Sequence, residues 1–431
     1  MLKLSYLIKG LILVIPLLGC SQGESGEATN YLKESRQINQ LSDSIGIDET
    51  TTETEPNFEI QFVREATYGT TDDVIVGIMG PVTVDRNGRV FITDRNQITV
   101  HVFQHDGNYL TSLGNQGRGP GEFMGITPNT TITIYSNQFY ITDQADAHLQ
   151  FPYRMHEFSL EDLTFSRTID LLAGNKAEIE ELDGSYPEGY YSKRIYPLIG
   201  DKFLVSYLRS PNEYQDEVSY IYYVVQDTSG SIISDPVLKQ KDRTNLITEV
   251  ILPDMYYTAI HSFPFFGKSL LTVSKDNFLY AVNDSKKFNI DIYTMEGKHV
   301  RSVEHFFENI PFNKNEILDY YEKTNYMQRL GDGVALKMIR EAENLPEIWP
   351  AIEEMLIDDD NRLWVSTIVE DFDIYEWWVL KETGELVTRF EWPRDEPIEV
   401  VKNGFMYTRE TDEETGLQQV VRYRIEMTEA K

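Results

Sequence analysis

Two aspartates stand where acidic side chains could take part in chemistry. Asp94 and Asp143 each end a short hydrophobic run, VFITD and QFYITD. Carboxylate oxygens of this kind could contribute to a metal or ligand site if the two runs end at the same place. An aspartate at a strand end more often accepts hydrogen bonds from the backbone of the turn that follows. The pattern favours turn capping and leaves the metal or ligand site open.

Three other motifs suggest sites that their context does not support. The acidic run at Asp358–Asn361 offers oxygen ligands for calcium, but the bidentate glutamate of a calcium loop does not follow. His101 and His105 are four apart on a strand and not on one helix face, and no HExxH motif is present. The loop Gly114–Phe123 lacks the Gly-Lys-Ser/Thr of a phosphate loop, and no helix follows it. We therefore assign no catalytic, metal or cofactor-binding residue, and we expect no cofactor.

A short hairpin is the element that positions these residues. In VDRNGRVFITD (Val84–Asp94), Asn87 and Gly88 fit a type I′ turn, because both central positions of that turn need positive φ. The β-branched and aromatic residues that follow fit a strand. One hairpin cannot bury a face and is marginal alone, so this one needs copies of itself.

The chain contains five such copies. In the closest copy, IDDDNRLWVST (Ile357–Thr367), Asp358 aligns with Asp85 and Trp364 with Phe91. A second, outer turn recurs in step with the hairpins, at residues 106–107, 229–230, 296–297 and 383–384. Repeats of this size predict an all-β, six-bladed β-propeller. The expected inner turns lie near Gly88, Asn137, Asp201, Asn277, Asn361 and Gly404.

The propeller is expected to span residues 57–428, with one helical insertion at about 313–343 between the fifth and sixth inner hairpins. Asn313 and Glu316 resemble a capping box at the start of that insertion. It would either pack on one rim or serve as a lid or docking element. We expect the strand at Phe58–Val63 to complete the last blade, so that no sheet edge stays open.

The N-terminus has the pattern of a lipoprotein signal. Residues 1–19 combine Lys3 and Lys9 with an apolar run too short to span a bilayer, and Leu17-Leu18-Gly19-Cys20 resembles a lipobox. Cys20 would carry the lipid, and as the sole cysteine it excludes disulfides. Residues 20–56 are rich in Ser, Thr and Glu, which predicts a disordered acidic linker. We therefore expect an extracytoplasmic protein of the bacterial cell envelope, lipid-anchored in the outer membrane.

The charge of the chain limits its partners. The net charge is −31 at pH 7, and a strongly acidic chain does not suit a nucleic-acid partner, which needs a basic surface. The same charge repels anionic lipid headgroups, so contact with the membrane should come from the lipid anchor alone.

The region 109–152 resembles an NHL-type repeat. The shared features are a glycine-rich connector ending in Gly-Glu-Phe, a hydrophobic inner strand, a short turn and an aromatic strand that ends in Asp143. The Gly-Pro-Gly-Glu-Phe form is similar to that of six-bladed propeller lipoproteins of bacteria related to the Bacteroidetes. We expect a binding module for an unidentified small molecule, glycan or protein. The alternative is a metal-dependent, lactonase-like hydrolase with acidic residues in the central channel, for which Asp94 and Asp143 are the motivation.

Overall fold

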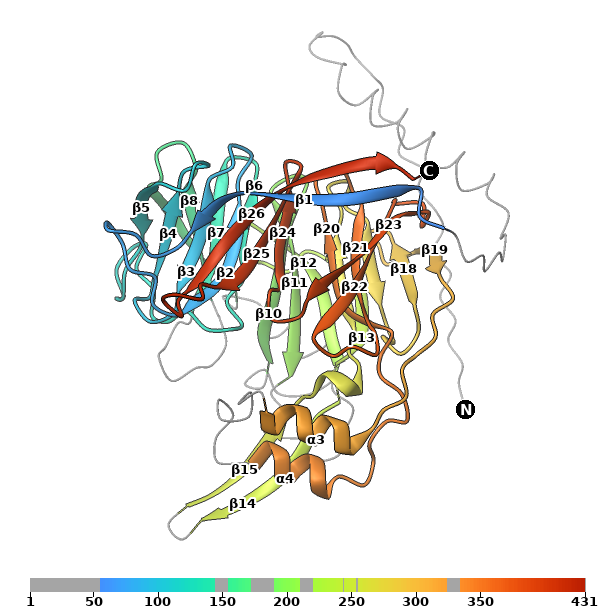
Figure 1. The fold of residues 1–431 in the computed structure, drawn as a ribbon. Coiled ribbons are helices and arrows are strands. Elements are labelled where there is room, and N and C mark those ends of the chain that lie inside the picture. The colour runs from blue at the N-terminus through green and yellow to red at the C-terminus, as the bar shows by residue number, and fades with distance from the viewer. Residues whose placement is uncertain are drawn as a thin grey trace, which may run out of the picture. The chain divides into compact units, whose positions relative to one another are not determined.

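The computed structural model describes residues 55–143, 154–171, 190–209, 220–242, 244–252, 255–323 and 334–430. The expected signal peptide, the lipid attachment residue Cys20 and nearly all of the linker fall within residues 1–54 and so lie outside the described residues. The described residues form six four-stranded antiparallel sheets, each a blade (Figure 1), which confirms the all-β, six-bladed propeller.

In the first five blades the four strands follow the chain order from the centre of the propeller outward. Blade 1 consists of β2 (Met79–Val84), β3 (Val90–Asp94), β4 (Thr99–Phe103) and β5 (Tyr109–Leu113). Blade 2 consists of β6 (Ile132–Tyr135), β7 (Gln138–Asp143), β8 (Arg154–Ser159) and β9 (Phe165–Asp170). Blade 3 consists of β10 (Tyr190–Leu198), β11 (Lys202–Arg209), β12 (Tyr220–Asp227) and β13 (Leu238–Lys241).

The second half of the propeller repeats this order. Blade 4 consists of β16 (Leu270–Val273), β17 (Leu279–Val282), β18 (Asn289–Tyr293) and β19 (His299–Glu304). Blade 5 consists of β20 (Ile352–Ile357), β21 (Leu363–Ile368), β22 (Ile374–Leu380) and β23 (Leu386–Pro393). Blade 6 consists of β24 (Ile398–Lys402), β25 (Phe405–Thr411), β26 (Gln418–Glu429) and, from the other end of the chain, β1 (Phe58–Tyr68).

The first strand of each blade lies nearest the central axis, the line about which the blades are arranged. These inner strands contact one another from blade to blade, in the pairs β2–β6, β6–β10, β16–β20, β20–β24 and β24–β2. Large side chains fill the space between neighbouring blades. Phe91 of blade 1 stacks on Phe139 of blade 2 with ring centroids 5.0 Å apart, and Phe288 of blade 4 packs on Trp378 of blade 5 at 5.0 Å.

The N-terminal strand closes the ring. β1 pairs antiparallel with β26 from Phe58 opposite Glu429 to Tyr68 opposite Val420, and Figure 1 shows the two strands side by side. This confirms that the strand at Phe58–Val63 completes the last blade. The pairing covers the edge of β26, which would otherwise be open to another strand.

All six expected inner turns join the first and second strands of their blades. The turn type expected at Asn87–Gly88 was wrong, because Gly88 has positive φ (77°) and Asn87 does not. The amide of Gly88 donates to Asp85 O at 3.1 Å, which makes a type I turn followed by one left-handed residue. A type I′ turn does occur at Asn403–Gly404, where both residues have positive φ and Lys402 pairs with Phe405.

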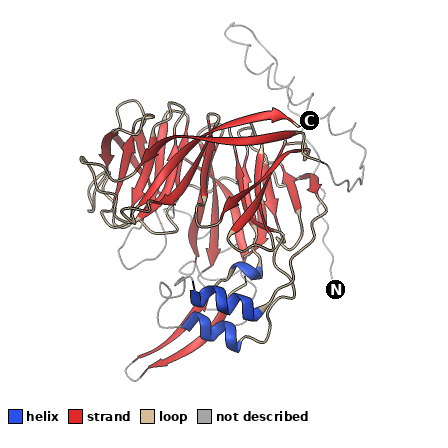
Figure 2. Cartoon of the chain, viewed as in Figure 1, coloured by secondary structure: helices blue, strands red, loops and turns tan. Residues whose placement is uncertain are grey.

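In the described residues, two insertions enter between blades, and Figure 2 shows their helices in blue beside a hairpin that extends away from the propeller. The hairpin is β14 (Leu246–Leu252) with β15 (Met255–His261), followed by the short 3-10 helix η3 (Pro264–Phe266). The helices are α3 (Lys314–Lys323) and α4 (Val334–Glu341). They precede β20, so the expected place between the fifth and sixth inner hairpins was wrong. The insertion follows the fourth inner turn at Asn277 and precedes the fifth at Asn361.

The insertions pack on the propeller through an apolar cluster. Ile317 of α3 and Ile339 of α4 join Phe265, Trp349 and Ile368 in one buried group. Asn313 caps α3 by accepting the amide of Asn315 at 3.0 Å and by donating to Glu316 at 2.8 Å. Ile368 ends β21, so the helices rest on a rim of the propeller, as the simpler of the two interpretations predicted. None of the helices in the described residues is long and apolar enough to cross a membrane.

Candidate functional site

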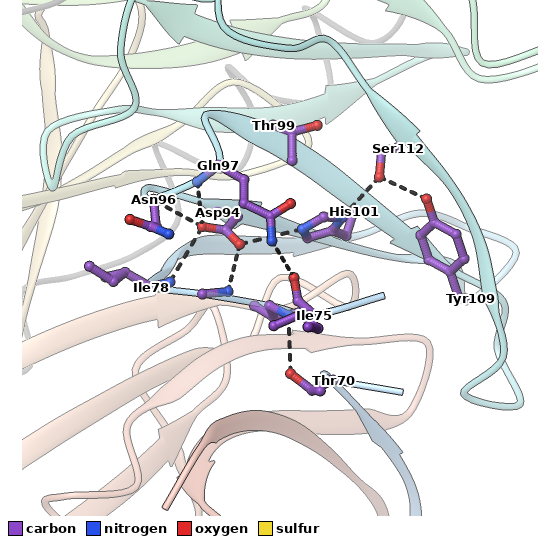
Figure 3. Close-up of polar contacts among 12 residues, drawn as sticks. Thr70, Ile75, Ile78, Asp94, Asn96, Gln97, Thr99, His101, Tyr109 and Ser112 are labelled. Carbon is purple, nitrogen blue, oxygen red and sulfur yellow. Dashed lines mark hydrogen bonds and ion pairs between the residues drawn. The ribbon is translucent and has the colours of Figure 1, made fainter. Parts of the chain in front are cut away.

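The first candidate residue, Asp94, is buried and capped by backbone amides (Figure 3). Its carboxylate accepts hydrogen bonds from Gly77 N at 2.6 Å, Asn96 N at 2.8 Å and Gln97 N at 3.0 Å, with a longer one from Ile78 N at 3.3 Å. Burial raises the pKa of Asp94, but these amide donors outweigh it and the pKa lies below the usual value. Asp94 therefore ties the loop before β2 to the turn after β3.

The second candidate, Asp143, makes the equivalent contacts one blade later. Its carboxylate accepts the amides of Met124 at 3.1 Å and Gly125 at 3.0 Å, and Arg154 lies 2.6 Å from Oδ2. Burial raises its pKa, and hydrogen bonds from His156 and from the two amides lower it below the usual value. Asp94 and Asp143 therefore belong to separate blades, and both act as turn caps, the interpretation that the residue pattern favoured.

A histidine and a hydroxyl extend each of these networks in the same way. His101 Nε2 lies 3.5 Å from Asp94, and His101 Nδ1 lies 2.9 Å from Ser112 Oγ (Figure 3). In blade 2, His156 lies 3.4 Å from Asp143 and 2.9 Å from Thr168 Oγ1. The combination resembles an acid–histidine–hydroxyl triad. Its repetition in two blades, with threonine in place of serine, fits a structural link across three strands better than a unique catalytic centre.

The other motifs also take structural roles. Asp358 accepts the amides of Asp360 at 3.0 Å and Arg362 at 2.8 Å, and its second oxygen lies 3.0 Å from Trp364 Nε1. Its second oxygen also accepts from Arg362 Nε at 2.7 Å, so both oxygens are used within the hairpin, as the alignment with Asp85 predicts. The glycine-rich connector Gly114–Phe123 places Phe123 in the core shared by blades 1 and 2.

Charged side chains that sequence reasoning missed occur on the inner strands. Regular pairing is interrupted in four of these strands, between Met79 and Val82 in β2, Ser192 and Arg194 in β10, Ile352 and Glu354 in β20, and Ile398 and Val400 in β24. Bulges of this kind re-aim side chains and are common beside functional sites. Here they place Arg194, Glu353, Glu354 and Glu399 at or next to the irregular positions. We call these residues, together with Lys268 and Arg409, the axial cluster.

Four members of the axial cluster form two ion pairs. Lys268 Nζ lies 2.6 Å from Glu353 Oε1, and Arg409 Nη2 lies 2.6 Å from Glu399 Oε1. Arg409 also donates to the backbone oxygens of Met79 at 3.2 Å and Gly80 at 2.7 Å. This arginine on β25 therefore joins blade 6 to blade 1 beside the axis.

Glu354 is the member whose ionisation is most altered. Desolvation by the surrounding protein raises its pKa to about 7, although the charge of Lys268 acts in the opposite direction. Glu353 and Glu399 add to the rise, and Arg194 opposes it. Four charged residues on or beside the inner strands thus act on the pKa of one carboxyl group. This convergence makes the axial cluster the candidate functional site.

The sequence does carry a signal for this site. The inner strands IEEMLI and IEVVK contain glutamates after a buried isoleucine, where a strand packed on both faces would continue with apolar residues. Such a break marks a side chain turned out of the interface between blades. Which breaks converge depends on the ring, and the sequence pattern of one blade does not show it.

The axial cluster does not have the composition of a metal centre. Within the described residues, no group of three or more histidine, cysteine, aspartate or glutamate side chains could hold a metal ion. The cluster combines cationic and anionic groups that largely neutralise one another, and this suits a polar ligand better than a hard cation.

The fold and this axial site define a six-bladed β-propeller with polar groups gathered about its axis. Residues 33–258 match the family model DUF5128, described as a 6-bladed beta-propeller. The match covers more than half of the 431 residues, and the chain belongs to this family. No curated protein matches the chain.

Solved structures similar to this chain include two from Bacteroides. A Bacteroides fragilis NCTC 9343 protein whose name describes it as exported has a TM-score of 0.44 and 14% identity, over 87% of this chain and 98% of that one. A member of the DUF4221 family from Bacteroides vulgatus ATCC 8482 has a TM-score of 0.48 and 10% identity, over 87% and 100%. A streptogramin B lyase has a TM-score of 0.35 and 11% identity, over 88% and 90%. We draw no function from these similarities.

Proposed function

We propose that this protein is a lipid-anchored, extracytoplasmic binding module that holds a ligand at the axial cluster. The observation that supports the proposal most strongly is that the inner strands of blades 3, 5 and 6 each carry a charged side chain at a break in regular pairing, namely Arg194, Glu354 and Glu399. Charged groups on strands from three or more blades are positioned by a rigid ring, so a ligand that contacts them would meet a preformed site. The ligand is a small molecule, a glycan or a segment of another protein.

Binding without catalysis fits the candidate residues better than hydrolysis. The lactonase-like alternative needs acidic ligands that share a metal, and Asp94 and Asp143 are instead engaged with backbone amides of their own blades. Their oxygens face the loops that they cap, so neither offers a free set of metal ligands. The alternative therefore gains no support.

The binding proposal is tested with purified full-length protein in detergent micelles. We expect at least one member of a panel of small acids, neutral sugars and peptides to raise the unfolding temperature, because a ligand that binds the folded state stabilises it. Nuclear magnetic resonance of the incubated ligand should then show it unchanged. Conversion of the ligand, or no stabilisation by any class, would contradict the proposal.

The lipid anchor has an independent test. Cys20→Ala should abolish incorporation of radiolabelled palmitate and release the protein from the membrane fraction, because the thiol is the proposed attachment point. A matched substitution four residues later, Glu24→Ala, should leave labelling and fractionation unchanged. Labelling that survives Cys20→Ala would show that lipid is not attached at this position.

A further inference from the structure

We propose that Arg194 is the anchor of an oxyanion-binding site at the axial cluster, where its guanidinium receives a carboxylate or phosphate group of the ligand. This inference rests on the proposed binding function and names the chemical class that the site selects. Three features of Arg194 support it: its position in β10, its exposure to solvent and the groups that interact with its guanidinium.

The backbone of β10 holds Arg194 at a fixed position. Pairing with β11 is irregular between Ser192 and Arg194, and the amide of Arg194 donates to Ser206 Oγ at 2.8 Å. The same bond recurs in blade 5, where the amide of Glu354 donates to Ser366 Oγ at 2.9 Å. Arg194 and Glu354 therefore occupy equivalent positions on their inner strands, one positive and one negative.

Arg194 is exposed, whereas the residue that follows it, Ile195, is buried between blades. The irregular pairing thus leaves the side chain of Arg194 accessible although its strand is the innermost of its blade. A ligand that approaches along the axis could reach the guanidinium.

Arg194 also differs from the other cations of the axial cluster in its partners. Lys268 and Arg409 each lie 2.6 Å from a glutamate. For Arg194, no ion pair is formed with any carboxylate of the described residues, and the group that acts most strongly on its charge is the hydroxyl of Tyr196, which itself donates to Leu271 O at 2.9 Å. Because the neighbouring tyrosine is neutral, the charge and the N–H groups of the guanidinium are available to an anion. The two parallel N–H donors of a guanidinium match the oxygens of a carboxylate or a phosphate.

Glu354 would make anion binding depend on pH. The groups that act on it are Lys268 ahead of β16, Glu353 beside it on β20, Glu399 on β24 and Arg194 on β10. Below its pKa of about 7 Glu354 is neutral, and above that value it becomes an anion that competes for Arg194 and repels a bound oxyanion. Affinity for an anion should therefore fall as pH rises through neutrality.

The test is calorimetric titration of the full-length protein at low salt with four probes. D-glucuronate and citrate carry carboxylates, inorganic phosphate represents the phosphate class, and D-glucose is the neutral counterpart of glucuronate. Titrations at about pH 6 and about pH 8 lie on either side of the Glu354 pKa of about 7. We expect saturable binding of at least one anion, weaker at the higher pH, and none of glucose.

Two variants and one control assign the effect. Arg194→Gln should weaken anion binding at least tenfold, because a hydrogen bond to a charged group is lost. Glu354→Gln should bind with little dependence on pH. Arg86→Gln removes the same charge from an exposed residue in the turn between β2 and β3, and it should bind as the wild type does. Unfolding temperatures of all three variants establish that they remain folded.

Each outcome separates this inference from the proposed function. Anion binding that Arg194→Gln leaves intact would overturn the inference. Binding of glucose, with no anion bound, would also overturn it but leave a binding module in place. If no probe binds saturably, the oxyanion site is refuted, and stabilisation by other ligand classes then decides the proposed function.

Discussion

At the scale of single residues, this protein uses buried carboxylates to fasten its loops. Asp94 and Asp143 each accept backbone amides from the segment that enters their blade, and each also faces a histidine on the next strand. A carboxylate that accepts several amides is stabilised in its charged form although it is buried. Burial lowers the pKa of His101, although the nearby Asp94 acts in the opposite direction. The lowered pKa favours the neutral imidazole, whose Nδ1 lies 2.9 Å from Ser112 Oγ.

Replacing Asp94 with asparagine should lower the free energy of unfolding by about 1–3 kcal/mol at neutral pH, because amide donors would lose a charged acceptor. The folded-state pKa of Asp94 is depressed, so its stabilisation is present above the unfolded pKa of about 4 and is lost as pH falls through the folded value. The deficit of Asp94→Asn relative to the wild type should therefore shrink in acid.

Urea unfolding at several pH values measures this difference. Asp72→Asn is the control, because Asp72 is exposed and should change the stability little at any pH. A deficit for Asp94→Asn that stays constant from neutral to acidic pH would show that the charge of Asp94 does not stabilise the fold.

At the scale of elements, one kind of turn recurs in three inner and four outer reversals. In these turns the backbone amide donates a hydrogen bond to the carbonyl oxygen three residues before it. Such bonds close the inner turns at Asp85–Gly88, Ser274–Asn277 and Asp358–Asn361. They also close the outer turns that end at Gly107, Gly230, Gly297 and Gly384. In each case the last residue has positive φ, which glycine and asparagine tolerate best.

Outer-turn glycines have a second role, because they approach the preceding blade closely. A Cβ at Gly297 would lie 2.3 Å from the backbone oxygen of Val237, and one at Gly230 would lie 2.2 Å from that of Asp170. Gly404 has a similar φ of 78° but nothing within 4 Å of a Cβ. The two kinds of glycine therefore separate the cost of backbone conformation from the cost of steric contact.

Gly404→Ala should cost about 1–2 kcal/mol of unfolding free energy, the price of a left-handed conformation for an L-residue. Gly297→Ala should cost at least about 1–3 kcal/mol more, because blades 3 and 4 must move apart to admit the methyl group. Chemical denaturation of both variants measures the difference. Equal losses would show that the outer turn does not hold neighbouring blades together.

The repeat pattern made the fold predictable from the sequence, down to the residues of every inner turn. Local chemistry was sufficient there, because turns such as that at Asn361 need particular residue types and the strands between them need β-branched or aromatic ones. The type of turn at Asn87 was not predictable in the same way, since Asn-Gly fits both two-residue and three-residue loops.

The candidate site was predictable only in part, because the glutamates in the inner strands IEEMLI and IEVVK interrupt an apolar pattern but do not show which residues come together. Asp94 and Asp143 carry the residue types of a site, yet their neighbours in space are backbone amides. Arg194 and Glu354 are 160 residues apart in the sequence and have no motif around them. Their relation depends on the bulges of two inner strands and on closure of the ring, which no single blade encodes.

At the scale of the whole molecule, closure of the ring makes the axial cluster possible. β1 pairs with β26 over the length of the last blade, and Phe62 of β1 packs on Phe390 and Trp392 of blade 5 with ring centroids 4.8 and 5.4 Å apart. Arg409 reaches from blade 6 to the backbone of β2 in blade 1. All three contacts join segments from opposite ends of the chain. The inner strands are therefore held in register around one axis.

The two insertions enter at the end of the propeller where the inner strands begin. Each connects the last strand of one blade to the first strand of the next, β13 to β16 and β19 to β20. Glu354 and Glu399 lie near the beginnings of their strands, so the insertions and the axial cluster belong to the same end. A ligand bound at the axial cluster would therefore lie at the same end of the propeller as the two insertions.

The most direct test of a binding module centred on the axis is a crystal structure with the ligand that stabilises the protein most. We expect density for that ligand beside Arg194 and Glu354, between the inner strands β10, β20 and β24. A ligand bound on the outer strands or on the insertions alone, with the axial cluster untouched, would contradict it.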